Sequence, residues 1–387
     1  MRTVCHAFSR EKQPPARRHL IIPLFIPHQG CPHHCVFCNQ RTITGAASEF
    51  LSPAAICAQV DRFLSHSRKD PAGIQIAFFG GNFLGLPESR LLQLLQTAAP
   101  FVRRGEVHSL RFSTRPDTIF PHTLDLIAPF PVSTVELGIQ SMRDTVLEAA
   151  CRGHRAADTV SAISQIKARG YAVGAQIMVG LPGDDAAGAM ETARQLVLLK
   201  PDFVRIYPTL VLADSPLASL FSAGRYLPMA LDACVTLVKN LFLFFQAHHI
   251  PVIRMGLQAS DGLSDGRNVL AGPWHPAFGH LVHSEIALDA IESMLKNEMP
   301  VSGPLSITVH PTRVSRVQGL NRRNLAILKD RYQVDEIVIH QDESLSPDQI
   351  KIGDRSVAEL IAGEESGPPA PFDSDAFLAQ MRAKHGQ

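Results

Sequence analysis

The sequence predicts an α/β fold: a partial βα barrel of six strand–helix units, followed by a small α+β module. Short, continuous apolar runs recur between residues 20 and 207, a pattern typical of parallel strands that are covered on both faces. Longer amphipathic segments separate these runs, as expected for the helices that cross over between parallel strands. Six units are fewer than the eight that close a full barrel, so the sheet is expected to remain open.

The individual elements follow from apolar periodicity and from local start and stop signals. The ranges expected to form strands are Leu20–Ile26, Ile74–Phe79, Val107–Thr114, Thr134–Ile139, Tyr171–Val179 and Phe203–Tyr207. The helices between them are expected over about residues 53–66, 88–102, 121–128, 156–169 and 185–199. Ser52-Pro53 is typical of an N-cap followed by proline at the first helical position. A helix over about residues 228–248 and a strand at Val252–Leu257 extend this domain.

Changes in composition divide the chain into four parts. Residues 1–18 are polar and basic and are expected to form a flexible arm, residues 19–299 the partial barrel, residues 300–360 a small domain, and residues 361–387 a tail. In the small domain a strand at Leu305–His310, a helix over about residues 313–329 and a strand at Glu336–His340 are expected.

Charge and hydrophobicity restrict the class of protein. The net charge of +1 argues against polyanion binding by the whole surface, although a local basic patch remains compatible with it. The N-terminus has no apolar signal core, and no apolar run reaches the length needed to cross a membrane. Three closely spaced cysteines, Cys31, Cys35 and Cys38, could bind a metal cluster, and such thiols must stay reduced. We therefore expect a cytoplasmic protein without a membrane partner.

Cys31, Cys35 and Cys38 form a C-x3-C-x2-C triplet directly after the first strand. Three thiolates at this spacing can bind three irons of a cubane iron–sulfur cluster, which leaves the fourth iron open to another ligand. A zinc site completed by His28, His33 or His34 is the alternative. Disulfides are not expected, because the other cysteines are scattered singly.

Polar residues follow the predicted strands at their carboxyl ends, where the reactive groups of parallel sheets collect. Gly80-Gly81-Asn82 follows the second strand, and paired glycines allow a ligand to approach the backbone closely. Gln140 ends the fourth strand, which also contains Glu136. Both could bind a ligand or belong to an internal hydrogen-bond network. Arg205 in the sixth strand needs an acceptor, which makes it a candidate site residue.

The cysteine triplet with Phe37 before its last cysteine, the Gly80-Gly81-Asn82 turn and the six βα units together resemble the radical S-adenosylmethionine (SAM) superfamily. In that superfamily the open iron of a 4Fe–4S cluster binds the amino and carboxylate groups of S-adenosylmethionine. An electron from the cluster then cleaves the S–C5′ bond to give a 5′-deoxyadenosyl radical. The resemblance implies that Phe37 packs near the adenine. It also implies that Gly80, Gly81 and Asn82 lie near the methionine amino group.

Further segments resemble the radical domain of the Elongator catalytic subunit. These segments are Ile26-Pro27-His28-x-Gly30-Cys31-Pro32, Thr114-Arg115-Pro116-Asp117, Glu136-Leu137-Gly138-Ile139-Gln140, Arg152-Gly153-His154 and Arg205-Ile206-Tyr207-Pro208. The resemblance implies an RNA substrate, with tRNA as the leading candidate, an electron donor such as flavodoxin or ferredoxin, and contacts from Gln140 and Arg205 to S-adenosylmethionine. No acetyltransferase chemistry is expected, and Asn82 stands where an acid or serine is commoner.

The strand–helix–strand pattern after residue 300 resembles a reduced KH module, in which a Gly-x-x-Gly loop clamps a nucleic-acid backbone. Here the fourth position is Arg322, which adds charge for a phosphate. An amphipathic helix with a basic solvent face is the alternative. Two other functions remain open. One is an oxidative decarboxylase resembling oxygen-independent coproporphyrinogen oxidase, and the other is a non-catalytic, metal-containing RNA-binding protein.

Overall fold

The computed structural model describes residues 20–26, 30–39, 51–66, 70–257, 263, 268–295, 303–353 and 355–358. The chain divides into two compact units between Val282 and His283. The predicted N-terminal arm, the predicted tail and His28 lie outside the described residues. The domain limits drawn from the sequence, with a boundary at residue 299, stay a prediction.

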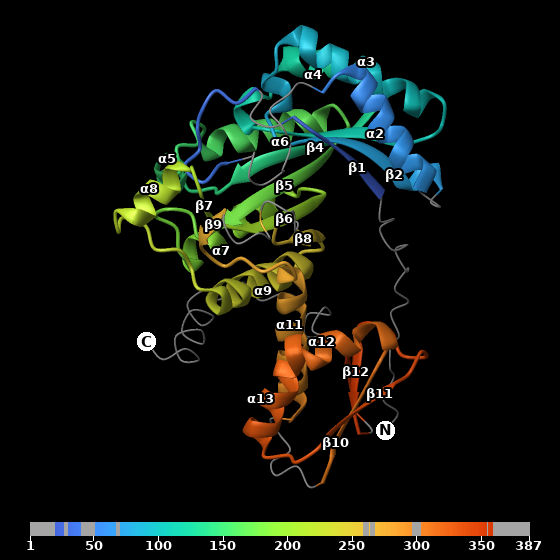
Figure 1. Ribbon diagram of the computed structural model, residues 1–387, viewed down its shortest axis with the longest axis vertical. Coiled ribbons are helices and arrows are strands. Elements are labelled where there is room, and N and C mark those ends of the chain that lie inside the picture. The colour runs from blue at the N-terminus through green and yellow to red at the C-terminus, as the bar shows by residue number, and fades with distance from the viewer. Residues whose placement is uncertain are drawn as a thin grey trace, which may run out of the picture. The chain divides into compact units, whose positions relative to one another are not determined.

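The first unit contains a seven-stranded sheet in the order β1-β2-β3-β4-β5-β6-β8, in which every neighbouring pair is parallel (Figure 1). Its strands are β1 (Leu20–Phe25), β2 (Ile74–Phe79), β3 (Ser109–Thr114), β4 (Val132–Gln140), β5 (Ala172–Val179), β6 (Phe203–Pro208) and β8 (Val252–Met255). The predicted fold class, an open βα barrel, is confirmed. The strand predicted from residue 252 supplies its seventh strand.

Helices alternate with these strands along the chain. They are α2 (Pro53–His66), α3 (Glu88–Arg103), α4 (Pro121–Ile127), α5 (Asp144–Ala149), α6 (Ala156–Ala168), α7 (Ala186–Leu199), α8 (Pro216–Ser222), α9 (Leu231–Ala247) and α11 (Phe278–Leu295). The predicted cap of α2 is present, since the Ser52 hydroxyl accepts the Ala55 amide at 3.2 Å. The sequence interpretation missed α5, α8, α11 and the short pair β7 (Val211–Leu212) and β9 (Val269–Ala271). No described helix is both long enough and apolar enough to cross a bilayer.

The two faces of the main sheet differ in polarity. On the face covered by helices, the Phe83 ring stacks between Phe78 and Phe112 at centroid distances of 5.0 and 4.6 Å, and all three side chains are fully buried. Burial of each ring stabilises the fold by about 1.5–3 kcal/mol. The opposite face carries polar side chains, because successive residues of a strand point to opposite faces of the sheet. We call it the inner face; its polar residues include Gln75, Arg111, Ser113, Glu136, Gln176, Arg205, Tyr207 and Arg254.

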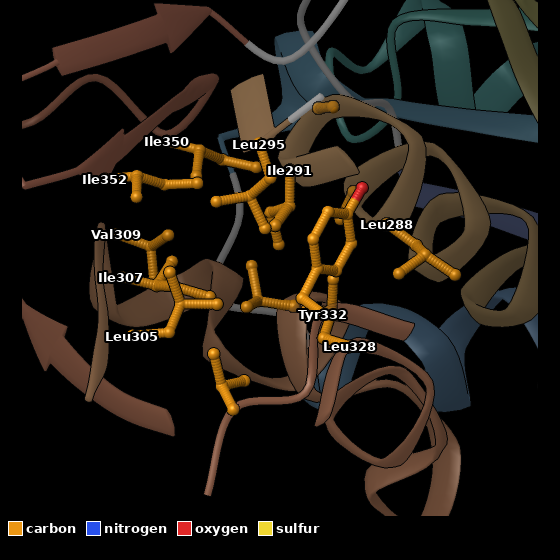
Figure 2. Packing of buried hydrophobic residues seen from close by; sticks show 14 residues of the cluster. Leu288, Ile291, Leu295, Leu305, Ile307, Val309, Leu328, Tyr332, Ile350 and Ile352 are labelled. Carbon is orange, nitrogen blue, oxygen red and sulfur yellow. The ribbon is translucent and has the colours of Figure 1, made fainter. Parts of the chain in front are cut away.

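The second unit packs a four-stranded sheet, in the order β11-β10-β12-β13, against helices. Its strands are β10 (Leu305–Val309), β11 (Ile337–Gln341), β12 (Gln349–Ile352) and β13 (Arg355–Ala358). Figure 2 shows Ile307 and Val309 of β10 facing Ile291 and Leu295 of α11 across the core of this unit. The predicted strand–helix–strand order is confirmed, with β10 and β11 parallel.

The prediction of one continuous helix over residues 313–329 is wrong. The segment is divided into α12 (Val314–Gln318) and α13 (Arg323–Tyr332). Between them, Gly319, Asn321 and Arg322 adopt φ angles of +72°, +51° and +61°, which an α-helix does not contain.

Candidate active site

The cysteine triplet lies in a loop, residues 30–39, that follows the carboxyl end of β1. Its backbone is attached to two other parts of the unit. The Val36 amide donates to the carbonyl of Ala150 at 3.1 Å, and the Val36 carbonyl accepts the Leu217 amide at 2.8 Å. Cys35 is buried, whereas Cys31 and Cys38 are half-buried. The fold therefore places the triplet at the edge of the sheet where parallel strands collect reactive groups.

Asn82 fixes the beginning of this loop. Its amide Nδ2 donates to the Gly30 carbonyl at 2.7 Å, and its Oδ1 accepts bonds from the Thr114 hydroxyl at 2.7 Å and the Arg115 amide at 3.0 Å. Gly30 has φ +73°, and a Cβ there would lie 2.2 Å from the Asn82 carbonyl oxygen. Only glycine fits this close approach. The fully buried Asn82 side chain thus holds the loop, while its predicted contact with a ligand amino group stays a prediction.

Two guanidinium groups approach the Cys35 sulfur. Arg152 Nη1 lies 3.1 Å from Cys35 Sγ, and Arg115 Nη1 lies 3.8 Å from it. The Arg115 guanidinium also donates to both oxygens of Asp117, at 2.9 and 2.8 Å. Arg152 Nη2 donates to the Gly138 carbonyl at 2.6 Å, and its Nε has no partner. The Cys35 sulfur is therefore in a positively charged environment.

This environment suits an anionic metal–thiolate group. Burial and the neighbouring Cys35 raise the pKa of the Cys31 thiol, whereas Arg115 and Arg152 act in the opposite direction. In the described part of the chain, no three cysteine, histidine or acidic side chains converge closely enough to hold a metal ion. The assignment of Cys31, Cys35 and Cys38 as ligands stays a prediction. The buried cations beside Cys35 fit it, because metal binding deprotonates thiols.

The predicted residues at the ends of β2 and β4 have backbone conformations that are unusual for strands. Gly80 has φ +88° and Gln140 has φ +71°, and the register between β4 and β5 shifts between Gly138 and Gln140. Gln140 is buried, and its Oε1 accepts no hydrogen bond. A buried carbonyl oxygen without a donor is costly unless a ligand supplies the donor, so Gln140 fits a binding role. Gly81 is half-buried beside Gly80.

Glu136 and Arg205 form an ion pair on the inner face, with a separation of 3.1 Å between Arg205 Nε and Glu136 Oε2. Gly174 of β5 is in register with Glu136 and with Phe203 of β6, and a Cβ there would lie 2.4 Å from the Phe203 ring and 3.0 Å from Glu136 Cγ. Arg111 bonds the other oxygen of Glu136 and donates to Gln75 Oε1 at 3.1 Å. Sequence reasoning missed Arg111. The pattern that could have identified it is the alternation of Ser109, Arg111 and Ser113 along β3, which places these polar residues on one face of the sheet.

Phe37 lies half-buried at the other end of the cysteine loop. It packs against an apolar cluster that includes Val146, Leu181 and Tyr226, and Met178 packs against the same cluster. The Tyr226 hydroxyl donates to the Gly180 carbonyl at 2.6 Å. An aromatic side chain held on this surface is compatible with stacking on an adenine, which stays a prediction.

Comparisons with known proteins agree with this arrangement. The model of the radical SAM superfamily matches residues 25–196, and that of the radical SAM C-terminal domain matches residues 201–287. The chain belongs to the radical SAM superfamily. It is an enzyme of this class, and its cofactors are a 4Fe–4S cluster and S-adenosylmethionine.

Three relatives show how far the similarity extends. An uncharacterized protein of Methanocaldococcus jannaschii is 28% identical over 249 residues, which are 62% of this chain and 75% of the relative. A tRNA uridine(34) acetyltransferase of the same organism is 29% identical over 134 residues, 34% of this chain and only 25% of the relative. The structure of Elp3 from Methanocaldococcus infernus has a TM-score of 0.54 at 17% identity, covering 71% of this chain and 64% of that one. The last match shows a shared fold.

Proposed function

We propose that this radical SAM enzyme modifies RNA, with tRNA as the substrate class. The observation that carries the proposal is the cationic inner face beside the cysteine loop. Three arginines lie on that face, Arg111, Arg205 and Arg254, together with one carboxylate, Glu136. The excess of positive charge suits a polyanionic substrate.

The part of the inner face that a substrate would meet is formed by β5, β6 and β8. Gln176, Arg205 and Arg254 are neighbours in the register across these three strands. All three side chains are half-buried, whereas the residues that alternate with them in β5 and β6 are fully buried. A guanidinium and an amide on an accessible surface can bind phosphate oxygens and base edges.

The relatives support the same substrate class. The tRNA uridine(34) acetyltransferase of Methanocaldococcus jannaschii carries tRNA in its name, and Elongator complex protein 3 of Saccharomyces cerevisiae is 26% identical over 262 residues. The chain spans less than half of either relative, 25% and 46% of their lengths. The acetyltransferase activity of the first is therefore not carried over. The oxidative decarboxylase alternative has no observation of its own among the described residues.

The second unit adds a candidate RNA contact. The turn between α12 and α13 presents Arg322 and Arg323, whose side chains are exposed. This turn occupies the position of the Gly-x-x-Gly loop in the KH-like order β10–α12–α13–β11. Two arginines at this turn can bind phosphate.

In this proposal Cys31, Cys35 and Cys38 hold the cluster, and Phe37, Gly80, Gly81, Asn82, Gln140 and Arg205 surround S-adenosylmethionine. When bound, these cofactors supply a radical able to abstract hydrogen from an unactivated carbon. The protein itself holds the loop through Asn82 and offers Gln140 as an acceptor. A flavodoxin or ferredoxin would deliver the electron, in a reducing cytoplasm.

The cofactor part is tested by anaerobic reconstitution. The wild-type protein is expected to bind about four irons and four sulfides per chain and to release 5′-deoxyadenosine from S-adenosylmethionine when dithionite is added. Cys35→Ala should lose the cluster and the cleavage, whereas Cys151→Ala, a change at an exposed cysteine outside the triplet, should keep both. Retention of both by Cys35→Ala would contradict the ligand assignment.

The substrate part is tested by binding to total tRNA at several salt concentrations. Wild-type affinity should fall steeply with salt, and the double variant Arg322→Ala/Arg323→Ala should reduce the slope of log K against log salt by about 1–2. Arg62→Ala/Arg103→Ala, a matched pair of exposed arginines on α2 and α3, should leave the slope unchanged. Equal slopes in all three proteins would remove the α12–α13 turn from the proposal.

A further inference from the structure

Arg152 is a buried cation without a buried anion. Its side chain is only 5% exposed, yet no carboxylate lies within ion-pair distance of it in the part of the chain that the structure describes. Its two terminal nitrogens are bonded to Cys35 Sγ, at 3.1 Å, and to the Gly138 carbonyl, at 2.6 Å. Its Nε is buried and has no partner. Burying a charge without a partner of opposite sign lowers the stability of the fold by several kcal/mol. We therefore expect a negative group to bind next to Arg152.

Arg115 reaches the same sulfur but is neutralised. Its Nε and Nη2 donate to the two oxygens of Asp117, at 2.9 and 2.8 Å, and Nη2 also donates to the carbonyl of Arg152. Its distance to Cys35 Sγ, 3.8 Å, is longer than that of Arg152. The Asp117 side chain is 19% exposed. Two cations therefore lie near Cys35. Arg152 has no carboxylate partner, whereas the charge of Arg115 is largely cancelled by Asp117.

We propose that Arg152 sets the reduction potential of the cluster by donating a charged hydrogen bond to the Cys35 sulfur. Reduction adds one electron from an external one-electron donor to the cluster, with no bond made or broken, and makes the cluster and its thiolates one charge more negative. A fixed cation beside one of those sulfurs stabilises the reduced form more than the oxidised form. Arg152 therefore raises the potential, and Asp117 lowers it by cancelling the charge of Arg115. Arg152 is a positioning residue that acts through Cys35, and this inference does not depend on the RNA substrate.

The test is a dye-mediated potentiometric titration of the reconstituted protein, followed by the electron paramagnetic resonance signal of the reduced cluster, without S-adenosylmethionine. Arg152→Met should lower the ratio of reduced to oxidised cluster at fixed potential about tenfold, which for one electron is a shift of about 59 mV to more negative values. Arg152→Lys keeps the charge and should shift the potential by less than half as much. Asp117→Asn frees the charge of Arg115 and should shift it to more positive values.

Arg155→Met is the matched control, since Arg155 is exposed and lies three residues further along the same segment. It should leave the potential unchanged, because water screens its charge. Opposite signs for Arg152→Met and Asp117→Asn support the proposal, since general damage to the loop would not produce them. If Arg152→Met fails to bind iron, Asp117→Asn decides: a shift to more positive values supports the proposal, and an unchanged or more negative potential overturns it.

Three results would overturn the proposal. One is a potential that does not change in Arg152→Met while the iron content is retained. Another is a shift that appears only after S-adenosylmethionine is added, which would place Arg152 on that ligand instead. The third is a wild-type protein that assembles no cluster. A protein with the predicted potentials but without tRNA binding would disprove the proposed substrate and leave this inference intact.

Discussion

The first unit holds two groups of buried or half-buried arginines, and the two groups differ in the partners that face their charges. On the inner face, Arg111 and Arg205 share the carboxylate of Glu136, so that three strands of one sheet supply both signs of charge. At the cysteine loop, Arg152 has a thiol and a backbone carbonyl as partners and no carboxylate. Both groups lie within the same barrel, yet only the arginines of the first group share a carboxylate.

The presence or absence of a carboxylate partner distinguishes arginines that stabilise the sheet from an arginine that belongs to a cofactor site. A buried cation whose partner is a side chain of the protein stabilises the sheet whether or not a ligand is present. A buried cation without such a partner favours the state in which an anion binds. We infer that Glu136 stabilises the sheet by pairing with Arg111 and Arg205, and that the Arg152 environment is tied to the iron–sulfur cluster.

The largest expected effect comes from removing the shared carboxylate. Glu136→Gln would leave the two guanidiniums of Arg111 and Arg205 facing a neutral amide in a buried site, and should lower the free energy of unfolding by about 3–5 kcal/mol. The measurement is urea denaturation followed by the fluorescence of Trp274, the only tryptophan, which lies in the first unit.

An exposed ion pair gives the control for this change. Arg104 and Glu106 bond at 2.7 and 2.9 Å, but their side chains are 52% and 37% exposed. Glu106→Gln should therefore cost less than about 1 kcal/mol. Equal losses in the two variants would show that the Glu136 network does not stabilise the sheet.

Most of the strands of the barrel could be predicted from the sequence, because each depends on a local run of apolar residues. The range of β2 was predicted to the residue, and the other parallel strands within a few residues, since buried strands are continuous apolar runs. The cysteine spacing located the loop. By contrast, α11 begins inside a Pro- and Gly-rich stretch and is apolar on several sides, so it lacks the periodic stripe on which helix prediction depends.

The contacts within the candidate site could not be predicted from the sequence, because they join residues that are far apart in the chain. Arg152 belongs to a segment that was recognised by resemblance, but its bond to Cys35 spans 117 positions of the chain. The break between α12 and α13 has a similar origin. Asn324 donates to the carbonyls of Ser284 and Arg316, and a tertiary bond of this kind overrides helix propensity.

A smaller loss of stability is expected at Asn82, where the cysteine loop is attached to the frame. Asn82→Ala removes the donor to Gly30 and the acceptor for Thr114, Thr118 and Arg115, and should cost about 2–3 kcal/mol, because several buried groups lose their partners. The iron content after reconstitution should fall in parallel. Gln93→Ala, at an exposed amide of α3, should change neither quantity. If Asn82→Ala weakens only the binding of S-adenosylmethionine, the side chain contacts the ligand and does not hold the loop.

The smallest effect, when it is measured over one pH unit, is a pH dependence next to the uncompensated cation. Burial, and then the charge of Arg152, lower the pKa of His154 from 6.5 to about 3, so the folded protein keeps this imidazole neutral while the unfolded chain protonates it. The contribution of His154 is therefore fully present above pH 6.5 and is lost as pH falls toward 3, with a slope of about 1.4 kcal/mol per pH unit. His154→Gln should remove this slope, so the variant gains stability relative to wild type on acidification, as measured by urea denaturation at several pH values.

His122→Gln, at an exposed histidine of α4, should not alter the slope. A parallel pH dependence in wild type and His154→Gln would mean that the imidazole is protonated in the folded protein, and that the positive charge around Cys35 is weaker than the geometry of Arg152 indicates.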